Sequence, residues 1–470
     1  MINYTATYTD LYELTMAQVY YEQNRHKEQA VFDYFFRSLP FDGGYAIFCG
    51  LETLLDVLEG LEFSDDDLDY LKREGLDPEF VDYLQSFTFE GDIYSSPEGD
   101  LIFPNRPVLQ VEGTFLEAQI IETLLLNILN FQTLIATKAS RIKQSAGERK
   151  LADFGLRRAQ GPGGYYASRA AFVGGFNATS NVIAGRDFGI PITGTMAHSY
   201  IQSYDSELQA FRDFAKGRPD DCVLLVDTYD TLKSGLPNAI TVAKEMEDRG
   251  DRLKGIRLDS GDLAYLSKQS RKKLDAEGLD YVKIAASNQL DEKLVKSLID
   301  QNAPIDLFGV GTNLVTGDPD AALDGVYKLS MINHKPRLKL SESIEKLTLP
   351  HKKQVYRIFD GPDHDQMYGA EAVTLREEDD IDTMYHPYEK HKHLDLSKKI
   401  KKPLLLKVME GGRRISEKKS LPDLQEFAVN QISTLPEEFT RFENPHIYKI
   451  GLSKKLKSER DQLREQYQPK

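Results

Sequence analysis

The 470-residue sequence has no tryptophan and only two cysteines, Cys49 and Cys222, which lie far apart and outside any CxxC spacing. So few cysteines exclude a disulfide framework and a cysteine zinc site, and they fit a reducing compartment. The N-terminal stretch MINYTATYTDLYEL lacks the basic-then-apolar order of a signal peptide. A long apolar run is also missing, because acidic and amide side chains interrupt the most apolar helix candidate, 115–136. We therefore expect a cytosolic (cytoplasmic) protein that does not span a membrane.

Positive charge is scarce as well. The chain has 59 lysines and arginines against 74 acidic residues, which gives a formal net charge of −15. This balance argues against a general nucleic-acid or membrane-surface binder, although a few basic residues in one pocket suffice to bind a phosphorylated small molecule. The basic segment 390–420 is predicted to be a solvated face. We expect no metal at His386, His391 and His393, because they lie among lysines that would repel a cation.

The length predicts two or three cores. Residues 1–135 mix helical and strand patterns, with helices expected at 13–21 and 51–61, a strand at 30–36 and a long amphipathic helix at 116–135. After residue 325 the pattern changes to short strands, at 327–331 and 354–358, and loops. The tail from Lys454 is predicted to form a polar helix.

A different rhythm begins near residue 150. Six β-rich runs, each followed by a helix-length segment, occur in the order LADFG, IPITGT, CVLLVDT, GIRLD, YVKIAAS and DLFGVG. Successive βα units predict a parallel sheet, as a closed or nearly closed barrel or, alternatively, as an open doubly wound sheet. Active sites of such barrels form at the carboxyl ends of the strands. Polar or small residues follow the strands at Arg157, Thr195, His198, Asp227, Asp259, Ser287, Asn288, Gly311 and Thr312.

Two of these strand ends carry the strongest chemical signals. GTMAHSY (194–200) places His198 one turn after Gly-Thr, where a histidine can act as acid, base or phosphoryl acceptor. A lone histidine is more often structural. GIRLDSGDL (255–263) places Arg257 and Asp259 on one face of a strand, where the arginine could bind phosphate and the aspartate Mg²⁺ or sugar hydroxyls. A buried Arg–Asp ion pair is the simpler alternative.

Three further motifs are weaker in isolation. FGLRRAQGPGG (154–164) could stack Phe154 on a planar ring while Arg157 or Arg158 pairs with a carboxylate, or it could be a surface loop. FGVGT (308–312) could hold phosphate with its amides. In VDTYDT the acids Asp227 and Asp230 have the wrong spacing for a type I phosphoribosyltransferase loop or an aspartyl phosphatase.

In this order the motifs resemble the nicotinate phosphoribosyltransferase family along the whole chain. The similar segments are TDLYELTMAQ, FDYFFRSLPFDGGYAIFCGLE, FGLRRAQGP, GGFNATSNVIAG, GTMAHS, LVDTYDTL, IRLDSGDL, FGVGTNLVT and LPEEFTRFENPHIYKIGLS. His351 and Ala178 depart from the pattern, since glycine is expected at both positions.

The resemblance implies a type II phosphoribosyltransferase fold, an irregular α/β barrel over 136–324. It also implies an α/β domain of both chain ends, 1–135 completed by about 325–390, with 391–470 as a C-terminal extension. The implied reaction joins nicotinate to phosphoribosyl pyrophosphate, with Mg²⁺, giving nicotinate mononucleotide and pyrophosphate in NAD biosynthesis. ATP hydrolysis would be coupled to it through a phosphohistidine. A homodimer with shared active sites is also implied.

Residue roles follow from the same resemblance. His198 would be the phosphohistidine, beside Asp227, and Tyr12 and Phe154 would enclose the pyridine ring. Arg157, Thr195 and Ser180 would lie near that ring; nicotinamide-using relatives have aspartate at the position of Ser180, although a serine there could instead simply cap the following helix. The phosphoribosyl group would be held by Arg257, Asp259, Ser287, Asn288, Gly311 and Thr312.

Two other functions compete with this one. A nicotinamide or quinolinate phosphoribosyltransferase could use the same scaffold, and the residue contacting the pyridine substituent would discriminate between them. A barrel metallohydrolase is the alternative from another class, but it would need more strand-end histidines than His198 alone.

Overall fold

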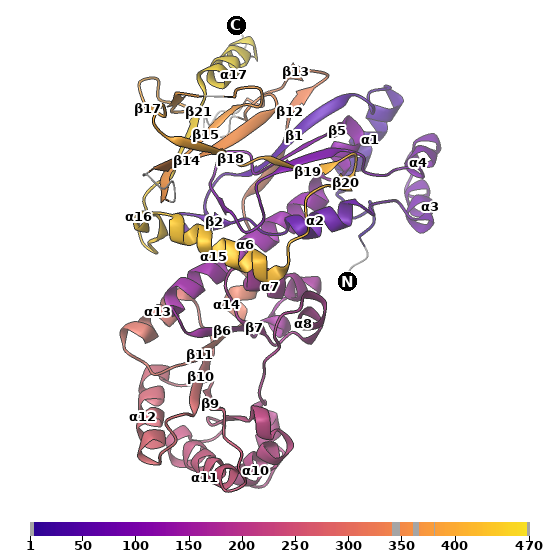
Figure 1. The fold of residues 1–470 in the computed structure, drawn as a ribbon. Helices are drawn as coiled ribbons and strands as arrows, with labels where there is room; N and C mark the ends of the chain where they lie inside the picture. Colours follow the sequence, from indigo (N-terminus) through magenta and orange to yellow (C-terminus); the bar gives the residue numbers. More distant parts are fainter. Residues whose placement is uncertain (1–3, 341–347, 361–365, 380, 468–470) are drawn as a thin grey trace. The chain divides into compact units, whose positions relative to one another are not determined.

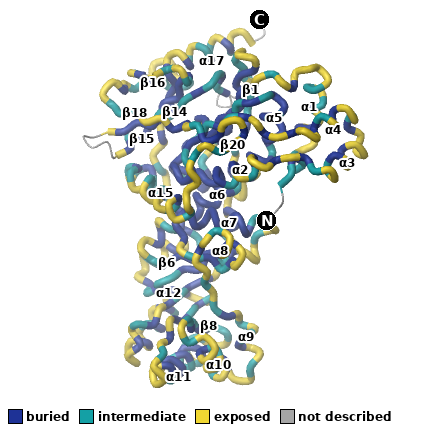
Figure 2. Tube along the Cα trace, turned by 45° about the vertical axis from the view of Figure 1, so that its right-hand side comes forward, coloured by how far each residue is buried: buried dark blue, intermediate teal, exposed yellow. Residues whose placement is uncertain are grey.

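The computed structural model describes residues 4–340, 348–360, 366–379 and 381–467. The chain forms two compact units, Met1–Thr137 with Ala322–Lys470 and Lys138–Ala321 (Figure 1). Within each unit the buried segments, dark blue in Figure 2, lie beneath exposed segments drawn in yellow. No helix among the described residues is both long and apolar enough to cross a bilayer.

The first unit is built around a seven-stranded sheet with the order β13-β12-β1-β5-β3-β19-β20. Strand β1 pairs antiparallel with both β5 and β12, so segments about 300 residues apart share one sheet. A second, two-stranded sheet joins β2 (Ala46–Ile47) to β4 (Leu101–Ile102). The strands of the large sheet are β1 (Gln29–Phe36), β3 (Asp92–Ser95), β5 (Leu109–Thr114), β12 (Gly325–Ile332), β13 (Lys335–Pro336), β19 (Leu406–Glu410) and β20 (Arg413–Arg414).

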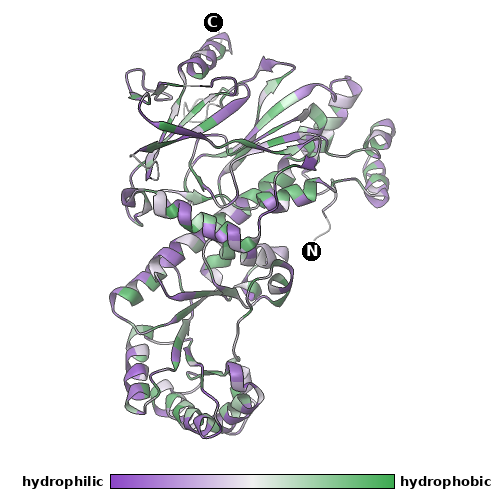
Figure 3. Ribbon diagram, viewed as in Figure 1, coloured by the Kyte–Doolittle hydropathy of each residue, from purple (hydrophilic) through white to green (hydrophobic). Residues whose placement is uncertain are grey.

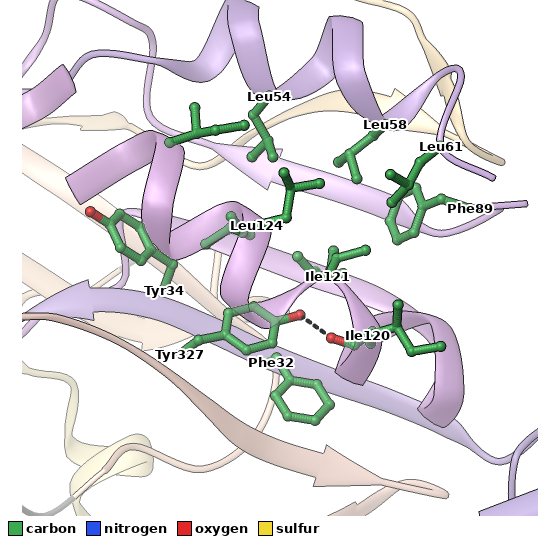
Figure 4. Close-up of a cluster of buried hydrophobic side chains, with 14 of the residues drawn as sticks. Phe32, Tyr34, Leu54, Leu58, Leu61, Phe89, Ile120, Ile121, Leu124 and Tyr327 are labelled. Carbon is green, nitrogen blue, oxygen red and sulfur yellow. Dashed lines mark hydrogen bonds between the residues drawn. The ribbon is translucent and has the colours of Figure 1, made fainter. Parts of the chain in front are cut away.

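The core of this sheet arises from the alternation of AVFDYFF. Phe32, Tyr34 and Phe36 alternate along β1 and are buried, as the two-residue period of a strand allows. Figure 4 shows Phe32 and Tyr34 in this core. The ring of Tyr327 stacks on Phe32 with centroids 4.8 Å apart, and its hydroxyl donates to the carbonyl oxygen of Ala118 at 2.9 Å.

Most helices of the first unit contribute buried side chains to this core. The long helix expected over 116–135 is divided at Ile121 into α5 and α6, and the unbroken apolar spacing gave no sign of that break. α17 is largely hydrophilic in Figure 3, as predicted, but it buries Leu456 and Leu463. The helices are α1 (Leu11–Glu22), α2 (Leu51–Leu58), α3 (Asp65–Arg73), α4 (Pro78–Leu84), α5 (Phe115–Ile120), α6 (Glu122–Ala146), α15 (Leu421–Thr434), α16 (Glu437–Thr440) and α17 (Lys454–Tyr467).

The chain after residue 325 is more regular than its sequence suggests. It adds a six-stranded sheet, β17-β16-β21-β15-β14-β18. Buried charges interrupt the alternation of apolar residues in these strands: Arg357 is paired with Asp100 at 2.5 Å and with Glu371 at 2.9 Å. The strands are β14 (Lys353–Asp360), β15 (Gln366–Leu375), β16 (Thr383–Tyr385), β17 (His393–Asp395), β18 (Ile400–Pro403) and β21 (Lys449–Leu452).

Part of the basic segment 390–420 has partners within the same unit. Lys399 pairs with Asp360 at 2.8 Å, and Lys418 pairs with Asp56 at 2.7 Å. Lys407 pairs with Asp92 at 2.9 Å. These pairs account for several of its charges without a nucleic-acid ligand.

The second unit contains the predicted parallel sheet, in the order β7-β6-β11-β10-β9-β8. Strands that are consecutive in the sequence lie side by side in this sheet, with the exception of the pair β7 and β8. The last strand, β11, pairs with the first, β6. Pairing of the last strand with the first is what closes a barrel. Here β7 and β8 do not pair, so the barrel stays open between them. The strands are β6 (Lys150–Asp153), β7 (Ala178–Thr179), β8 (Val223–Leu225), β9 (Gly255–Leu258), β10 (Lys283–Ser287) and β11 (Leu307–Val310).

The strand expected at 190–195 is reduced to one parallel bridge between Ile192 and Thr179, since Pro191 has no N–H to donate and Gly194 favours no strand. The other five predicted strands are confirmed. The helices of this unit are α7 (Pro162–Val173), α8 (Val182–Phe188), α9 (His198–Gln202), α10 (Glu207–Gly217), α11 (Leu236–Glu247), α12 (Leu263–Ala276), α13 (Glu292–Asp300) and α14 (Thr312–Val315).

Candidate active site

A pocket of about 440 Å³ lies in the second unit, where the carboxyl ends of the strands converge. This volume suits a small-molecule ligand. Seven of the residues predicted from the sequence line it. The lining residues are Phe154, Arg157, Ser180, Gly194, Thr195, Met196, Ala197, His198, Leu225, Arg257 and Asp259.

Arg257 is fixed at the floor of the pocket by its neighbours. Its Nη2 donates to Asp259 Oδ1 at 2.9 Å, and its Nε donates to the Ser287 hydroxyl at 2.9 Å. Ser287 in turn donates to Asp259. Nη1 reaches the Thr195 hydroxyl at 3.4 Å. The arginine is therefore held in one orientation, and the ion pair predicted as the structural alternative is present within the pocket itself.

Asp227 lies beside this group and has one unsatisfied oxygen. Its Oδ2 accepts from the Asp259 amide at 2.9 Å and from the Ser260 hydroxyl at 2.6 Å. Its Oδ1 is buried without a hydrogen-bond partner among the described residues. A carboxylate oxygen left in this state suits a hard cation such as Mg²⁺. No cluster of three or more metal-ligating side chains occurs in the described ranges, so further ligands would have to come from substrate or water.

His198 begins α9, and its side chain is 40% exposed. Its Nδ1 lies 3.0 Å from the Thr228 hydroxyl, and its Nε2 lies 3.8 Å from Asp259 Oδ2. The imidazole is thus oriented from both sides and still accessible. The sequence prediction missed Thr228 and Ser260. Their positions directly after Asp227 and Asp259 were the only available signal.

Phe154 follows β6 and lies flat against β11. A Cβ atom at Gly309 would come within 2.4 Å of its ring, so only glycine fits there. The guanidinium of Arg257 lies 5.4 Å from the centroid of the same ring, within cation–π range. Phe154 therefore forms a fixed aromatic wall of the pocket.

Ser180 lines the pocket, and its hydroxyl has no hydrogen-bond partner within the described part of the chain. The helix after it is capped by Asn181, whose side chain accepts from the Ala184 amide. The alternative interpretation of Ser180 as a helix cap is therefore wrong.

Four predicted residues neither line this pocket nor bond to the group around Arg257. Tyr12 lies on α1 of the first unit and is half-exposed. Asn288 directly follows β10 with a φ of 95°, and Gly311 directly precedes α14, which starts at Thr312. Their ligand contacts remain predictions.

A parallel barrel with arginine, aspartate and an accessible histidine at its strand ends defines a protein that binds a small anionic molecule and can perform chemistry on it. Family profiles agree along the chain. The nicotinate phosphoribosyltransferase N-terminal domain matches residues 7–130, the nicotinate phosphoribosyltransferase family matches 149–362, and the C-terminal domain matches 352–460.

Individual relatives agree as well. The nicotinate phosphoribosyltransferase of Bacillus subtilis is 44% identical over 460 residues, covering 95% of this chain and 92% of that protein. The nicotinate phosphoribosyltransferase of Caenorhabditis elegans is 37% identical over 517 residues, covering 95% and 91%. The crystal structure of human nicotinic acid phosphoribosyltransferase matches with a TM-score of 0.86 at 30% identity, covering 97% and 99%. The chain belongs to the nicotinate phosphoribosyltransferase family, and the predicted fold is confirmed.

Proposed function

We propose that this protein transfers the phosphoribosyl group of phosphoribosyl pyrophosphate to the ring nitrogen of nicotinate, as a step of NAD biosynthesis in the cytosol. The observation that carries the proposal is the group Arg257–Asp259–Ser287, fixed beside an aromatic wall and an accessible histidine in a chain of this family. Both cysteines are buried and neither forms a disulfide, which fits a reducing compartment.

The chemistry requires one bond to break and one to form at C1′ of the ribose. The bond to the pyrophosphate oxygen breaks, and pyrophosphate leaves with its electron pair. The lone pair of the pyridine nitrogen forms the new bond, and no general base is needed because that nitrogen carries no proton. Positive charge develops at the sugar, where the Asp259 carboxylate would stabilise it. Arg257 would bind the phosphoribosyl phosphate, together with Asn288, Gly311 and Thr312.

The pyridine would lie against Phe154, with its carboxylate near Arg157, Thr195 and the free hydroxyl of Ser180. Stacking fixes the direction of the ring nitrogen toward C1′, which is the main contribution that binding can make to this attack. A neutral residue at 180 favours nicotinate over nicotinamide, because a carboxylate there would repel the substrate anion.

Mg²⁺ fits the acidic side of the pocket, since Asp227 Oδ1 is unsatisfied and Asp259 lies next to it. Bound by these carboxylates, it would neutralise charge on the pyrophosphate. His198 would accept the γ-phosphoryl group of ATP. Its nitrogen attacks the phosphorus while ADP leaves with the bridging oxygen, and water later releases inorganic phosphate. Thr228 would hold the imidazole for that transfer.

A homodimer with shared active sites would bring Tyr12 of one subunit to the pyridine of another. Exposed apolar side chains support this assembly, at Leu11, Tyr12 and Val19 on α1 and at Val182 and Ile183 on α8. Contiguous patches of exposed apolar side chains commonly mark subunit interfaces.

The test is direct. Purified protein with labelled nicotinate, phosphoribosyl pyrophosphate and Mg²⁺ should give nicotinate mononucleotide, faster with ATP than without it. Nicotinamide and quinolinate, offered in parallel, should be poor substrates. Product from quinolinate or nicotinamide alone would replace the proposal with the corresponding activity, and no product from any pyridine would refute it.

A further inference from the structure

A buried carboxylate without a basic partner lies directly behind the pyridine end of the pocket. Asp153, the last residue of β6, is 1% exposed. Its Oδ1 accepts from the Gly155 amide at 2.8 Å, and its Oδ2 accepts from the hydroxyls of Ser168 at 2.7 Å and Thr179 at 2.8 Å. No ion pair to it occurs among the described residues. Burying a carboxylate is costly, and these three donors offset part of that cost.

The donors extend into a connected network. The Asn181 amide donates to the Thr179 hydroxyl at 3.0 Å, and the Asn181 side chain donates to the Ser168 hydroxyl at 3.2 Å. Ser168, Thr179 and Asn181 are all buried. Three separate elements, β6, α7 and β7, are therefore joined at one carboxylate.

The residues of this network are close neighbours in the sequence of residues that line the pocket. Ser180 lies between two members of the network, and its own amide donates to the Asp153 carbonyl oxygen at 2.8 Å. Phe154 directly follows Asp153. The Gly155 amide, held by the Asp153 carboxylate, starts the short helix that carries Arg157. Three of the residues proposed to contact the pyridine, Phe154, Arg157 and Ser180, thus share one anchor that itself touches no ligand.

We infer that Asp153 is a positioning residue that sets the geometry of the pyridine subsite through Phe154, Arg157 and Ser180. The inference rests on the proposed function. The hydrogen-bonded support of the pyridine side is separate from that of Arg257, because no hydrogen bond described for the network reaches Arg257 or Asp259.

Disturbing this network should therefore change the KM for nicotinate much more than the KM for phosphoribosyl pyrophosphate. Asp153→Asn keeps the size of the side chain but replaces one acceptor oxygen with an NH2 group. Because all three partners of the wild-type carboxylate are donors, this NH2 group would face a donor in either orientation of the amide. We expect the KM for nicotinate to rise about tenfold or more, while the KM for phosphoribosyl pyrophosphate stays within about twofold. Thr179→Val should shift the nicotinate KM in the same direction, whereas Thr179→Ser, which keeps the hydroxyl, should stay close to the wild type.

A matched control is Glu207→Gln. Glu207 is also buried in this unit, and its carboxylate accepts from the side chains of Ser234 and Asn238. It should lower the melting temperature without changing the ratio of the two KM values. If Asp153→Asn does not fold, the Thr179 pair carries the comparison.

Hydrogen exchange separates this inference from the proposed function, because it needs no substrate. Asp153→Asn or Thr179→Val should raise amide exchange in 154–158 and 180–184 and leave 255–261 unchanged. Equal changes in both KM values, or unchanged exchange in 154–158, would overturn the positioning role even in an active enzyme. An inactive wild type would refute the proposed function alone, and the exchange data would still decide the role of Asp153 as an anchor.

Discussion

Replacing Ser180 with aspartate tests how the pocket chooses its pyridine. The added carboxylate would face the carboxylate of nicotinate across a pocket of about 440 Å³. At 4 Å and an effective dielectric of 20 the repulsion is about 4 kcal/mol, and at 8 Å it is about 2 kcal/mol. These energies correspond to a loss in kcat/KM of about 30-fold to about 1000-fold. Arg157 offsets only part of this repulsion, because it is exposed and solvent screens its charge.

The assay compares kcat/KM for nicotinate and nicotinamide in the wild type, Ser180→Asp and Ser180→Asn. The asparagine variant has nearly the same shape without the charge, so it should lose far less activity with nicotinate. Nicotinamide should be used as well as before or better in the aspartate variant, because its amide can donate a hydrogen bond to the introduced carboxylate. Because Asn181 caps α8, no helix cap is lost. Equal losses with both pyridines, or a collapsed melting temperature, would refute the reasoning.

Four more variants test the other parts of the site and the fold. His198→Ala should abolish acid-labile label from γ-labelled ATP yet retain weak ATP-independent synthesis; label on the variant would contradict the assignment. Asp259→Asn should lower kcat far more than it raises the KM for nicotinate, since its charge matters most when the sugar becomes cationic. Mixed Tyr12→Ala and His198→Ala subunits should regain ATP-coupled activity if sites are shared and subunits exchange, whereas a fully active monomer would exclude sharing. Burial raises the pKa of Glu13 from 4.5 to about 7, so its contribution to stability is present below pH 4.5 and lost as pH rises through 7. Between pH 5 and pH 8, the free energy of unfolding of Glu13→Gln should therefore rise by up to about 3 kcal/mol relative to that of the wild type, as measured by chemical denaturation. A difference between the two proteins that does not change with pH would contradict this.

The sequence predicted the barrel because local rules decide it. A parallel strand buried on both faces needs a run such as VLLV, and its polar residues gather at or just beyond its carboxyl end. Arg257, Asp259 and His198 could be placed together for that reason. The six-stranded sheet of the first unit was predicted only at 354–358, within β14, because buried ion pairs such as Arg357 with Glu371 replace apolar residues within its strands. A charge in a strand pattern indicates an exposed face unless its partner is known, and the partner here comes from another strand.

The structure explains one departure from the family pattern that could be located, but not explained, from the sequence. His351 stands where glycine was expected, and its φ is 70°, a left-handed conformation that glycine adopts without cost. The imidazole Nε2 lies 3.2 Å from Glu459 Oε2 on α17, a contact that glycine could not make.

The supporting residues of the site show most clearly what could not be predicted from the sequence. Thr228 orients His198 from another strand end, and Thr179 and Ser168 hold Asp153 from elements far along the chain. Threonine and serine are common everywhere, so their type carries no signal, and only their position in space does. Residues that contact a ligand can be recognised by chemical type at a strand end, whereas those that hold them in place are defined by tertiary packing. The pyridine subsite depends on both, which is why its selectivity should respond to the buried Asp153 as well as to Ser180.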